Sequence, residues 1–374
     1  MIYCYQFPDN IKTGADFYYS YVCKLLENRK DVIFFTDLPN FLENDLKNLK
    51  EDDVVINTLC FAHLFHYLRE KYNLKFRIIR DCQTSLHVSY LMQEALLQDY
   101  IQERDICLFP SEFTRSLYIH LFENLNEGNT IMCYPILKSF PKTVPKKTNE
   151  FKYGYLGRVT FAKNFDTVIN FAELSKERIL VAGKIEFPNE FLPPNIEYIG
   201  ETNEIWDFLS RIDVLLFPST ANIESLGRVI LEANHSCVKV IGANHGATPE
   251  NCSNLLNVEY KSEADLTYNN PLGKVDANEI INLKSLKEEN NKNFVEHEEL
   301  LINIIEEKFE RSKAISPNNF ILKSKVLMDL THQKIYIFEK TIQMLKSNNY
   351  FEVGPITQKI AKSINFNPKW MIKH

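Results

Sequence analysis

The sequence predicts an α/β protein with two successive doubly wound parallel sheets and a helical C-terminal tail. Apolar runs of about four to seven residues alternate with helix-like segments through two stretches of the chain, a pattern typical of parallel sheets covered by helices. A break rich in proline and lysine separates the two stretches. The length of 374 residues also favours more than one core.

The first predicted domain spans residues 1–140. Its strands are expected at Ile2–Phe7, Val32–Thr36, Val54–Asn57, Phe76–Asp81, Ile106–Phe109 and Thr130–Tyr134. Helices between them are expected at Asp16–Glu27, Phe61–Tyr72, Leu86–Gln102 and Ser111–Phe122. The segment 137–147, with two prolines, several lysines and no periodicity, is a linker.

The second predicted domain spans residues 148–275 and repeats the alternation. Strands are expected at Phe151–Leu156, Arg178–Ala182, Ile196–Ile199, Val214–Phe217 and Val238–Ile241. Helices are expected at Asn164–Leu174, Glu204–Ser210 and Leu226–Asn234. Because a ligand binds beyond the carboxyl ends of such strands, we expect the site in a crevice between the two sheets.

The remaining residues, 276–374, form a charged helical tail, as in Glu296–Arg311 and Lys323–Lys346. We expect this tail to pack back across both domains. Its Asn/Lys/Glu-rich stretch 284–293 is typical of a solvated surface.

The amino-acid composition indicates which ligands, metal sites and cellular location to expect. The net charge of −6 does not favour binding to nucleic acid. Eight scattered cysteines without a Cys-x-x-Cys pair indicate reduced, buried thiols rather than a disulfide framework or a zinc site. The N-terminus does not resemble a signal peptide, and no apolar run approaches the roughly 20 residues of a membrane helix. A cytoplasmic location is predicted, and peripheral membrane contact stays open.

Glycines mark the part of the chain where a ligand approaches the backbone. Seven of the eleven glycines lie between residues 154 and 246. Glycine allows close approach and unusual backbone angles. Ordinary turns account for about half of these positions, so the clustering alone only locates a candidate region.

Two cations follow the first strand of the second domain. Arg158 comes directly after Gly157, and Lys163 stands five residues later at the start of a helix. Helix amides already favour an anion there, and Arg and Lys both bind phosphate. A solvated Arg/Lys pair is the alternative reading of the same pattern.

Two glutamates follow a buried strand further on. Glu224 and Glu232 are eight residues apart, and Gly227 lies between them near a predicted helix N-terminus. If the intervening stretch is helical, the two residues are about 12 Å apart along its axis, the reach from a sugar across a diphosphate to a ribose. Glutamates exposed on an amphipathic helix are the alternative, but the apolar neighbours predict a buried helix.

A third loop, 240–250, contains Gly242 and Gly246 and ends at Glu250. Together and in this order, the three patterns resemble the C-terminal domain of GT-B glycosyltransferases of the retaining family 4. The resemblance covers about residues 150–255 and extends more weakly upstream. It implies two Rossmann-like domains and transfer of a sugar from a nucleoside-diphosphate sugar.

The resemblance also implies roles for individual residues. Arg158 and Lys163 would hold the diphosphate and stabilise the leaving nucleotide, and Glu224 would act near the reacting centre as the third catalytic residue. Glu232 would bind the ribose. The donor-binding positions are Gly14, Gly157, Arg158, Lys163, Gly183, Gly200, Glu224, Ser225, Leu226, Gly227 and Glu232. No cofactor and no metal are implied, since the cations replace the metal.

The sequence departs from the family pattern at Cys237-Val238-Lys239, at Gly246-Ala247 and at the single Gly14. The acceptor, a saccharide, a lipid-linked molecule or a glycoconjugate, falls to the first domain, where Asp81 and His87 are candidate contacts because strand ends face the cleft. Two alternatives stay open: a sugar-nucleotide epimerase on the same fold, and a non-catalytic partner subunit.

Overall fold

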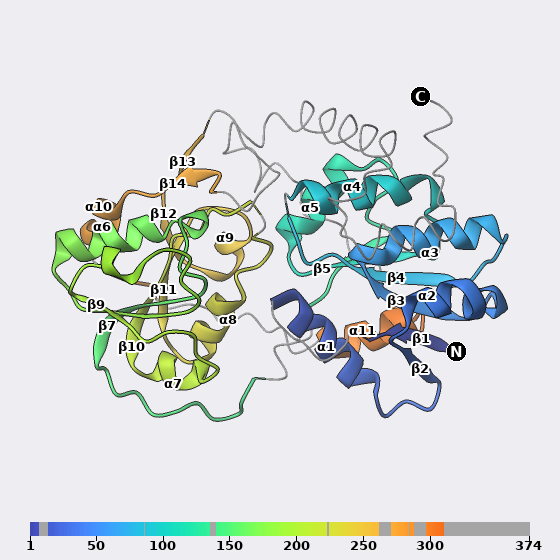
Figure 1. Cartoon of the computed structure of the whole chain (residues 1–374), viewed down its shortest axis with the longest axis horizontal. Coiled ribbons are helices and arrows are strands. Elements are labelled where there is room, and N and C mark those ends of the chain that lie inside the picture. Colours follow the sequence, from blue (N-terminus) through green and yellow to red (C-terminus); the bar gives the residue numbers. More distant parts are fainter. Residues whose placement is uncertain are drawn as a thin grey trace. The chain divides into compact units, whose positions relative to one another are not determined.

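The computed structural model describes residues 1–6, 14–85, 87–134, 140–222, 224–261, 271–283, 285–287 and 297–309 (Figure 1). The chain divides into two compact units. The first contains Met1–Ile136 together with α11 (His297–Ile305), and the second contains Leu137–Phe294. Each unit is built on its own six-stranded parallel sheet, the architecture that the sequence predicts.

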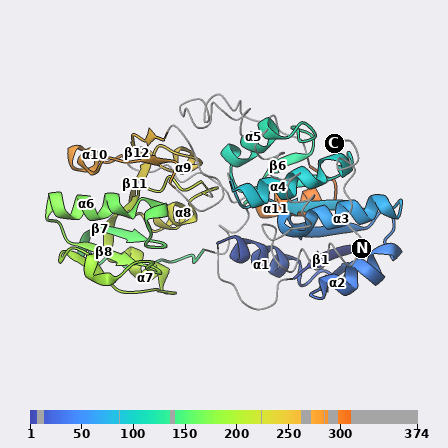
Figure 2. The same cartoon turned by 45° about the horizontal axis from the view of Figure 1, so that its top comes forward.

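The sheet of the first unit has the strand order β2-β1-β3-β4-β5-β6. These strands are β1 (Ile2–Tyr5), β2 (Val32–Phe35), β3 (Val54–Thr58), β4 (Arg77–Asp81), β5 (Ile106–Phe109) and β6 (Thr130–Met132). The helices are α1 (Gly14–Leu26), α2 (Leu38–Asn40), α3 (Leu59–Lys71), α4 (Val88–Leu97) and α5 (Glu112–Leu121), with short turns η1 (Phe41–Asp45), η2 (Leu46–Asn48) and η3 (Gln98–Tyr100). Helices α3 and α4 cover one face of the sheet, and α1 and α11 cover the other (Figure 2). All six predicted strands of this domain are confirmed.

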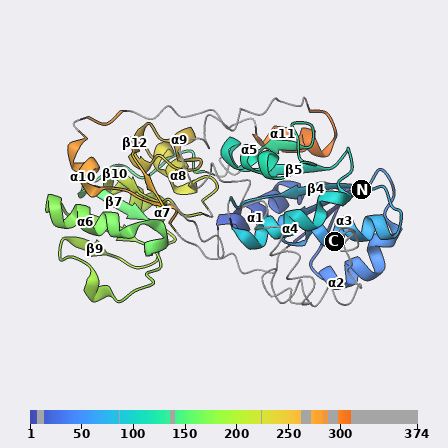
Figure 3. The ribbon, with the colours of Figure 1, turned by 90° about the horizontal axis from the view of Figure 1, so that it is seen from above.

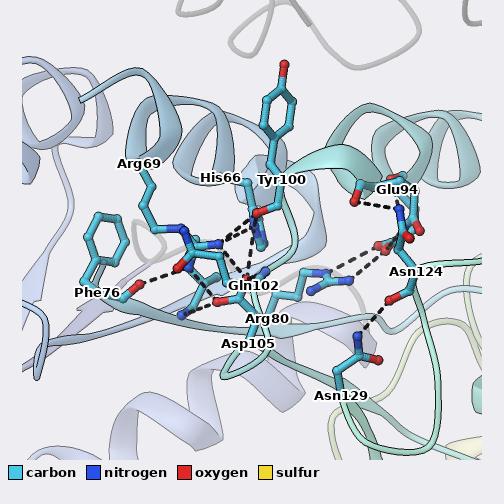
Figure 4. Close-up of polar contacts among 12 residues, drawn as sticks. His66, Arg69, Phe76, Arg80, Glu94, Tyr100, Gln102, Asp105, Asn124 and Asn129 are labelled. Atoms are coloured by element: carbon cyan, nitrogen blue, oxygen red, sulfur yellow. Dashed lines mark hydrogen bonds and ion pairs between the residues drawn. The ribbon is translucent and has the colours of Figure 1, made fainter. Parts of the chain in front are cut away.

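A buried charge network ties α3 to the start of β5 (Figure 4). The Arg69 guanidinium donates two hydrogen bonds of 2.6 Å to the Asp105 carboxylate, and both side chains are fully buried. Asp105 also accepts from the backbone N–H groups of Ile78 (3.0 Å) and Gln102 (2.8 Å). Because every oxygen of this carboxylate is hydrogen-bonded, the charge is tolerated inside the core.

Helix α11 is held against the first unit by polar contacts at both of its ends. At its N-terminus the His297 ring accepts a hydrogen bond of 2.8 Å from the Tyr134 backbone N–H. At its C-terminus the buried Arg77 guanidinium donates to the carbonyl of Ile304 (2.9 Å) and lies 3.1 Å from the Glu307 carboxylate. A cation satisfies the free carbonyls of a helix end. The predicted helix Lys323–Lys346 lies outside the described residues.

The sheet of the second unit has the strand order β12-β11-β10-β7-β8-β9 (Figure 3). These strands are β7 (Phe151–Leu156), β8 (Ile179–Ala182), β9 (Ile196–Tyr198), β10 (Ile212–Phe217), β11 (Lys239–Ala243) and β12 (Asn254–Leu256). The five predicted strands are confirmed, and β12 is an addition. A separate two-stranded antiparallel ribbon consists of β13 (Glu259–Tyr260) and β14 (Gly273–Lys274).

Two apolar clusters form the core of this unit, one on each face of the sheet. The first cluster packs β7 residues such as Tyr153 against α6 (Phe165–Ser175) and α10 (Ala277–Asn282). The second packs Phe151 and β10 residues against α7 (Ile205–Ser210) and α8 (Arg228–His235). Shorter helical segments are η5 (Phe161–Lys163), η6 (Asn189–Phe191) and α9 (Thr248–Asn251).

The strand order fixes where side chains from different loops meet. From β7 the chain proceeds through β8 to β9 on one side, and then returns to place β10, β11 and β12 on the other. The loops after β7 and β10 therefore diverge at a topological switch point, the place where ligands bind in open α/β sheets. Among the described helices, none combines the length and apolar composition that crossing a bilayer requires.

Candidate functional site

The loop after β7 presents Lys163 at the switch point. Thr160 caps the short turn η5, because its hydroxyl accepts a hydrogen bond of 3.3 Å from the Ala162 N–H. Asn164, in the left-handed conformation with φ of 53°, separates η5 from α6. This sharp change of direction places Lys163 at the end of the turn, where it reaches the neighbouring loop.

The loop after β10 presents Glu224 to Lys163. The Lys163 ammonium forms an ion pair with Oε2 of Glu224, and each side chain is less than one-fifth exposed. The other carboxylate oxygen accepts a hydrogen bond of 3.1 Å from the Gly227 N–H, at the start of α8. The Ser219 hydroxyl lies 3.4 Å from Oε2. The structure thus brings together three of the predicted site residues: Lys163, Glu224 and Gly227.

The environment keeps Glu224 ionised. Burial acts to raise the pKa of the Glu224 carboxyl, but the Lys163 ammonium and the Gly227 and Ser219 donors outweigh it, so that pKa lies below its usual range. At neutral pH the site therefore contains a carboxylate and an ammonium in contact. Both charges can reorganise around a ligand that carries charge and hydroxyl groups.

The loop after β11 contributes His245, which is 3% exposed. Burial lowers the pKa of His245 to about 4, so the ring is neutral at physiological pH. Glu224 and the Ala221 backbone act to raise this pKa and Lys163 acts to lower it, but burial outweighs them. His245 Nδ1 lies 3.2 Å from the Tyr260 hydroxyl.

Three turns that contain glycine follow β7, β8 and β9. The Gly157 N–H donates to the Ala182 carbonyl (3.0 Å), and the Gly183 N–H donates to the Gly200 carbonyl (2.8 Å). The turns after β7, β8 and β9 are thereby joined by backbone hydrogen bonds. They form a continuous edge of main chain.

Arg158 and Glu232 lie apart from the Lys163–Glu224 pair in their contacts. Arg158 is about two-fifths exposed, and its guanidinium lies 3.8 Å from the Glu186 carboxylate. Glu232 is buried on α8, where the Arg228 guanidinium lies 2.8 Å from one of its oxygens. Burial raises the pKa of Glu232, and Arg228 offsets part of that rise.

The assumed helical spacing between the two glutamates is wrong. Helix α8 begins at Arg228 rather than at Leu226, so Glu224 lies in the preceding loop. The axial estimate of about 12 Å assumed a continuous helix. It fails because Gly227, with a left-handed backbone, separates the loop from the helix.

The other predicted positions are distributed as follows. Ser225 and Leu226 lie in the loop between Glu224 and α8, and Leu226 is buried. Gly14 is the first residue of α1, and the loop before it lies outside the described residues. In the first unit, Asp81 ends β4 and is 6% exposed. His87 precedes α4, and burial lowers its pKa.

Two further polar residues lie at the site, and the sequence assigned no role to either. Asn164 and Thr220 are buried, and the Asn164 amide donates a hydrogen bond of 2.9 Å to the Thr220 hydroxyl. The Lys-Asn dipeptide and the Ser-Thr dipeptide were visible in the sequence. Their contact was not, because it joins residues that are 56 positions apart.

The fold and the arrangement at the switch point define a GT-B type two-sheet protein. Residues 138–257 match the family model described as "Glycosyl transferases group 1". The matched segment includes Lys163, Glu224 and His245.

Solved structures share the fold over most of the chain. Alr3699/HepE of Anabaena, crystallised with UDP and glucose, aligns with a TM-score of 0.52 and 14% identity over 86% of this chain and 98% of that one. AviGT4, a glycosyltransferase involved in avilamycin A biosynthesis, aligns with a TM-score of 0.50 and 15% identity over 82% of this chain and 96% of that one.

A curated relative covers a short segment. An uncharacterized 42.6 kDa protein in the cps region of Klebsiella pneumoniae is 30% identical over 91 residues, which is 23% of this chain and 24% of that protein. The chain therefore matches only about a quarter of the length of this relative.

Proposed function

We propose that the protein is a retaining glycosyltransferase of the family 4 type that transfers a hexosyl group from a nucleoside-diphosphate sugar. The observation that carries the proposal is the contact between Lys163, from the loop after β7, and Glu224, from the loop after β10, at the switch point of the second sheet. These are a phosphate-binding cation and a carboxylate that can bind sugar hydroxyls, presented at the edge where ligands bind.

In this proposal the second domain, residues 148–275, binds the donor. The Lys163 ammonium binds the diphosphate, and the exposed Arg158 side chain adds a second cation. As the bond to the sugar breaks, negative charge develops on the leaving nucleoside diphosphate, and fixed cations stabilise that charge without a metal ion. Glu224 binds the transferred sugar near the reacting carbon.

The nucleoside lies further along the same edge. The main-chain edge formed by the loops of Gly157, Gly183 and Gly200 borders the base. Glu232 binds the ribose hydroxyls, which requires its carboxylate to exchange part of its contact with Arg228 for the ligand. The first domain, residues 1–140, binds a saccharide, lipid-linked or glycoconjugate acceptor, with Asp81 and His87 as contacts.

A thermal-shift screen tests the proposal. A donor that binds only the folded protein raises its melting temperature by mass action. UDP and UDP-glucose are the first compounds to test, because the similar HepE structure was solved with UDP and glucose. The screen then extends to GDP, ADP, CDP and dTDP and their sugars.

Turnover separates binding from catalysis. With a donor found in the screen, release of the nucleoside diphosphate is measured for the natural chain and for Glu224→Ala. The variant should lose turnover and keep most of its nucleotide-dependent shift. Full activity of Glu224→Ala would refute the assignment, and a changed sugar formed without any acceptor would point to an epimerase.

A further inference from the structure

The ribbon β13–β14 contacts three loops of the candidate site. It lies outside the main sheet, and its register pairs Tyr260 with Gly273. Its contacts reach the loops after β7, β10 and β11 through hydrogen bonds of side chains and main chain. A short ribbon has little stability of its own, so these contacts hold it in place and also constrain the loops.

The first contact centres on the Gly273 carbonyl. This oxygen accepts hydrogen bonds from the Asn164 amide (2.9 Å) and from the Thr220 hydroxyl (2.7 Å). The Thr220 hydroxyl in turn accepts from the Asn164 amide (2.9 Å) and the Gly273 N–H (3.2 Å). The Asn164 and Thr220 side chains are at most 3% exposed, so these bonds form away from water.

The main chain reinforces this contact. The Leu272 N–H donates to the Thr220 carbonyl (2.9 Å), and Ala221 forms an isolated antiparallel bridge with Pro271. The start of the Glu224 loop is thereby paired with the strand that enters β14. A loop paired in this way has fewer conformations than one that is free in solvent.

The two side chains adjoin the charged pair. Asn164 directly follows Lys163, and Thr220 stands four residues before Glu224. A bond between Asn164 and Thr220 therefore fixes the backbone next to Lys163 and the start of the loop that carries Glu224. Removing it loosens the connection between the two loops, in which the Asn164 amide also donates to the Pro218 carbonyl (3.2 Å), although neither charged side chain is altered.

A second contact lies on the other strand of the ribbon. The Tyr260 hydroxyl donates to the Asn244 carbonyl (3.1 Å) and lies 3.2 Å from His245 Nδ1. This ties the loop after β11 to β13. The ribbon consequently contacts the loops that carry Lys163, Glu224 and His245.

We infer that the ribbon is a positioning element of the donor site, in which Thr220 and Asn164 are positioning residues that hold Lys163 and Glu224 in contact. The inference rests on the proposed function only for its effect on turnover. Precise placement of binding groups matters because a displacement of about 1 Å can lower a rate by about 100-fold.

The chain offers a matched control for Thr220→Val. Thr167, on α6, is also buried, and its hydroxyl donates to the Val275 carbonyl (3.0 Å) just beyond β14. Thr167→Val removes one buried hydroxyl near the ribbon without touching the loop of Lys163 or that of Glu224. Thr220→Ser keeps the hydroxyl and serves as the conservative rescue.

The first measurement needs no substrate. Lys163→Met and Glu224→Gln form a double-mutant cycle, measured by denaturant unfolding of the full chain in the natural, Thr220→Val and Thr167→Val backgrounds. We expect the coupling to be about 10-fold in the unfolding equilibrium constant in the natural and Thr167→Val backgrounds, and about 2-fold or less with Thr220→Val. Equal coupling in the two valine backgrounds would overturn the inference.

A second variant guards against misfolding of Thr220→Val. Asn164→Gly tolerates the left-handed backbone and removes the amide bonds, so it should reduce the coupling in the same way. Unchanged coupling in Asn164→Gly would count against the inference.

Turnover supplies the second measurement and separates the two proposals. With an active donor, Thr220→Val should lower kcat by about 10-fold or more and change the donor KM by less than about 3-fold, because alignment is lost rather than affinity. Thr220→Ser should restore kcat. Retained kcat in Thr220→Val would refute the ribbon's role in catalysis. If the natural chain turns over no sugar nucleotide, the proposed function fails, and the coupling measurement still decides the positioning role.

Discussion

Replacing Gly183 with alanine should destabilise the second unit far more than replacing Gly200. Both residues have a positive φ, +138° and +81° respectively, so alanine strains the backbone at either position. A Cβ at Gly183 would lie 1.7 Å from the Gly157 carbonyl oxygen, whereas a Cβ at Gly200 would have nothing within 4 Å. The clash involves main chain, which no side-chain rotation relieves.

The expected loss of stability follows from the backbone strain and from the main-chain clash. Backbone strain costs about 1–3 kcal/mol at each position. Displacing the Gly157 turn brings the total for Gly183→Ala to about 4–5 kcal/mol, near the upper end for single substitutions. For a unit of this size, each kcal/mol lowers the melting temperature by about 2–4 °C, so we expect a loss of about 8–20 °C for Gly183→Ala and about 2–12 °C for Gly200→Ala.

Differential scanning calorimetry of the full chain measures both variants. Because Arg158 follows Gly157 directly, Gly183→Ala should also weaken the nucleotide-induced thermal shift. Equal losses in the two variants, or a larger loss for Gly200→Ala, would show that the turns after β7 and β8 do not pack as described.

Three further predictions concern other parts of the molecule. Asp105→Asn leaves the Arg69 charge buried without its counter-ion and should lower the free energy of unfolding by about 3–5 kcal/mol. Asp31→Asn, in a largely exposed ion pair, should lower it by about 1 kcal/mol or less. Thermal unfolding compares the two variants. Glu232→Ala should reduce the melting-temperature shift produced by a bound nucleoside diphosphate, and an unchanged shift would remove Glu232 from the ribose site. Burial lowers the pKa of His245 from 6.5 to about 4, so as the pH falls the unfolded chain binds a proton at this residue before the folded protein does. The free energy of unfolding is therefore unaffected by this group above pH 6.5 and should fall by up to about 3 kcal/mol toward pH 4. A His245→Asn variant should flatten that part of the stability curve measured by chemical denaturation, and an identical slope would contradict the neutral buried ring.

The strands of the main sheets could be predicted because parallel strands are buried on both faces. β5, for example, is entirely buried and reads as the uninterrupted apolar run Ile106–Phe109. β12 could not be predicted, since it starts with Asn254, whose amide donates to the Val240 carbonyl (3.0 Å). The ribbon strands contain two residues each and owe their existence to tertiary contacts rather than to a local pattern.

The candidate site was predictable to the extent that its residues follow strand ends. Lys163 and Glu224 were expected near one ligand, and their contact across 61 positions agrees with the switch point between β7 and β10. The Arg228–Glu232 pair has the i,i+4 spacing of a helix and could have been found from it. The contact of His245 with Tyr260 carries no sequence signal, because it depends on how β13 folds back.

Binding of nucleoside diphosphates to charge variants tests the central claim most directly. Calorimetric titration of UDP, or of the nucleotide that gives the largest thermal shift, is compared for the natural chain, Lys163→Met and Lys152→Met. Lys152 is an exposed residue of β7 paired with Glu177, and it controls for the loss of one positive charge. We predict an affinity about 10-fold or more lower for Lys163→Met, because a charge-assisted contact to phosphate is lost, and little change for Lys152→Met. Equal affinity in the natural chain and Lys163→Met would contradict a donor site built on the Lys163–Glu224 pair.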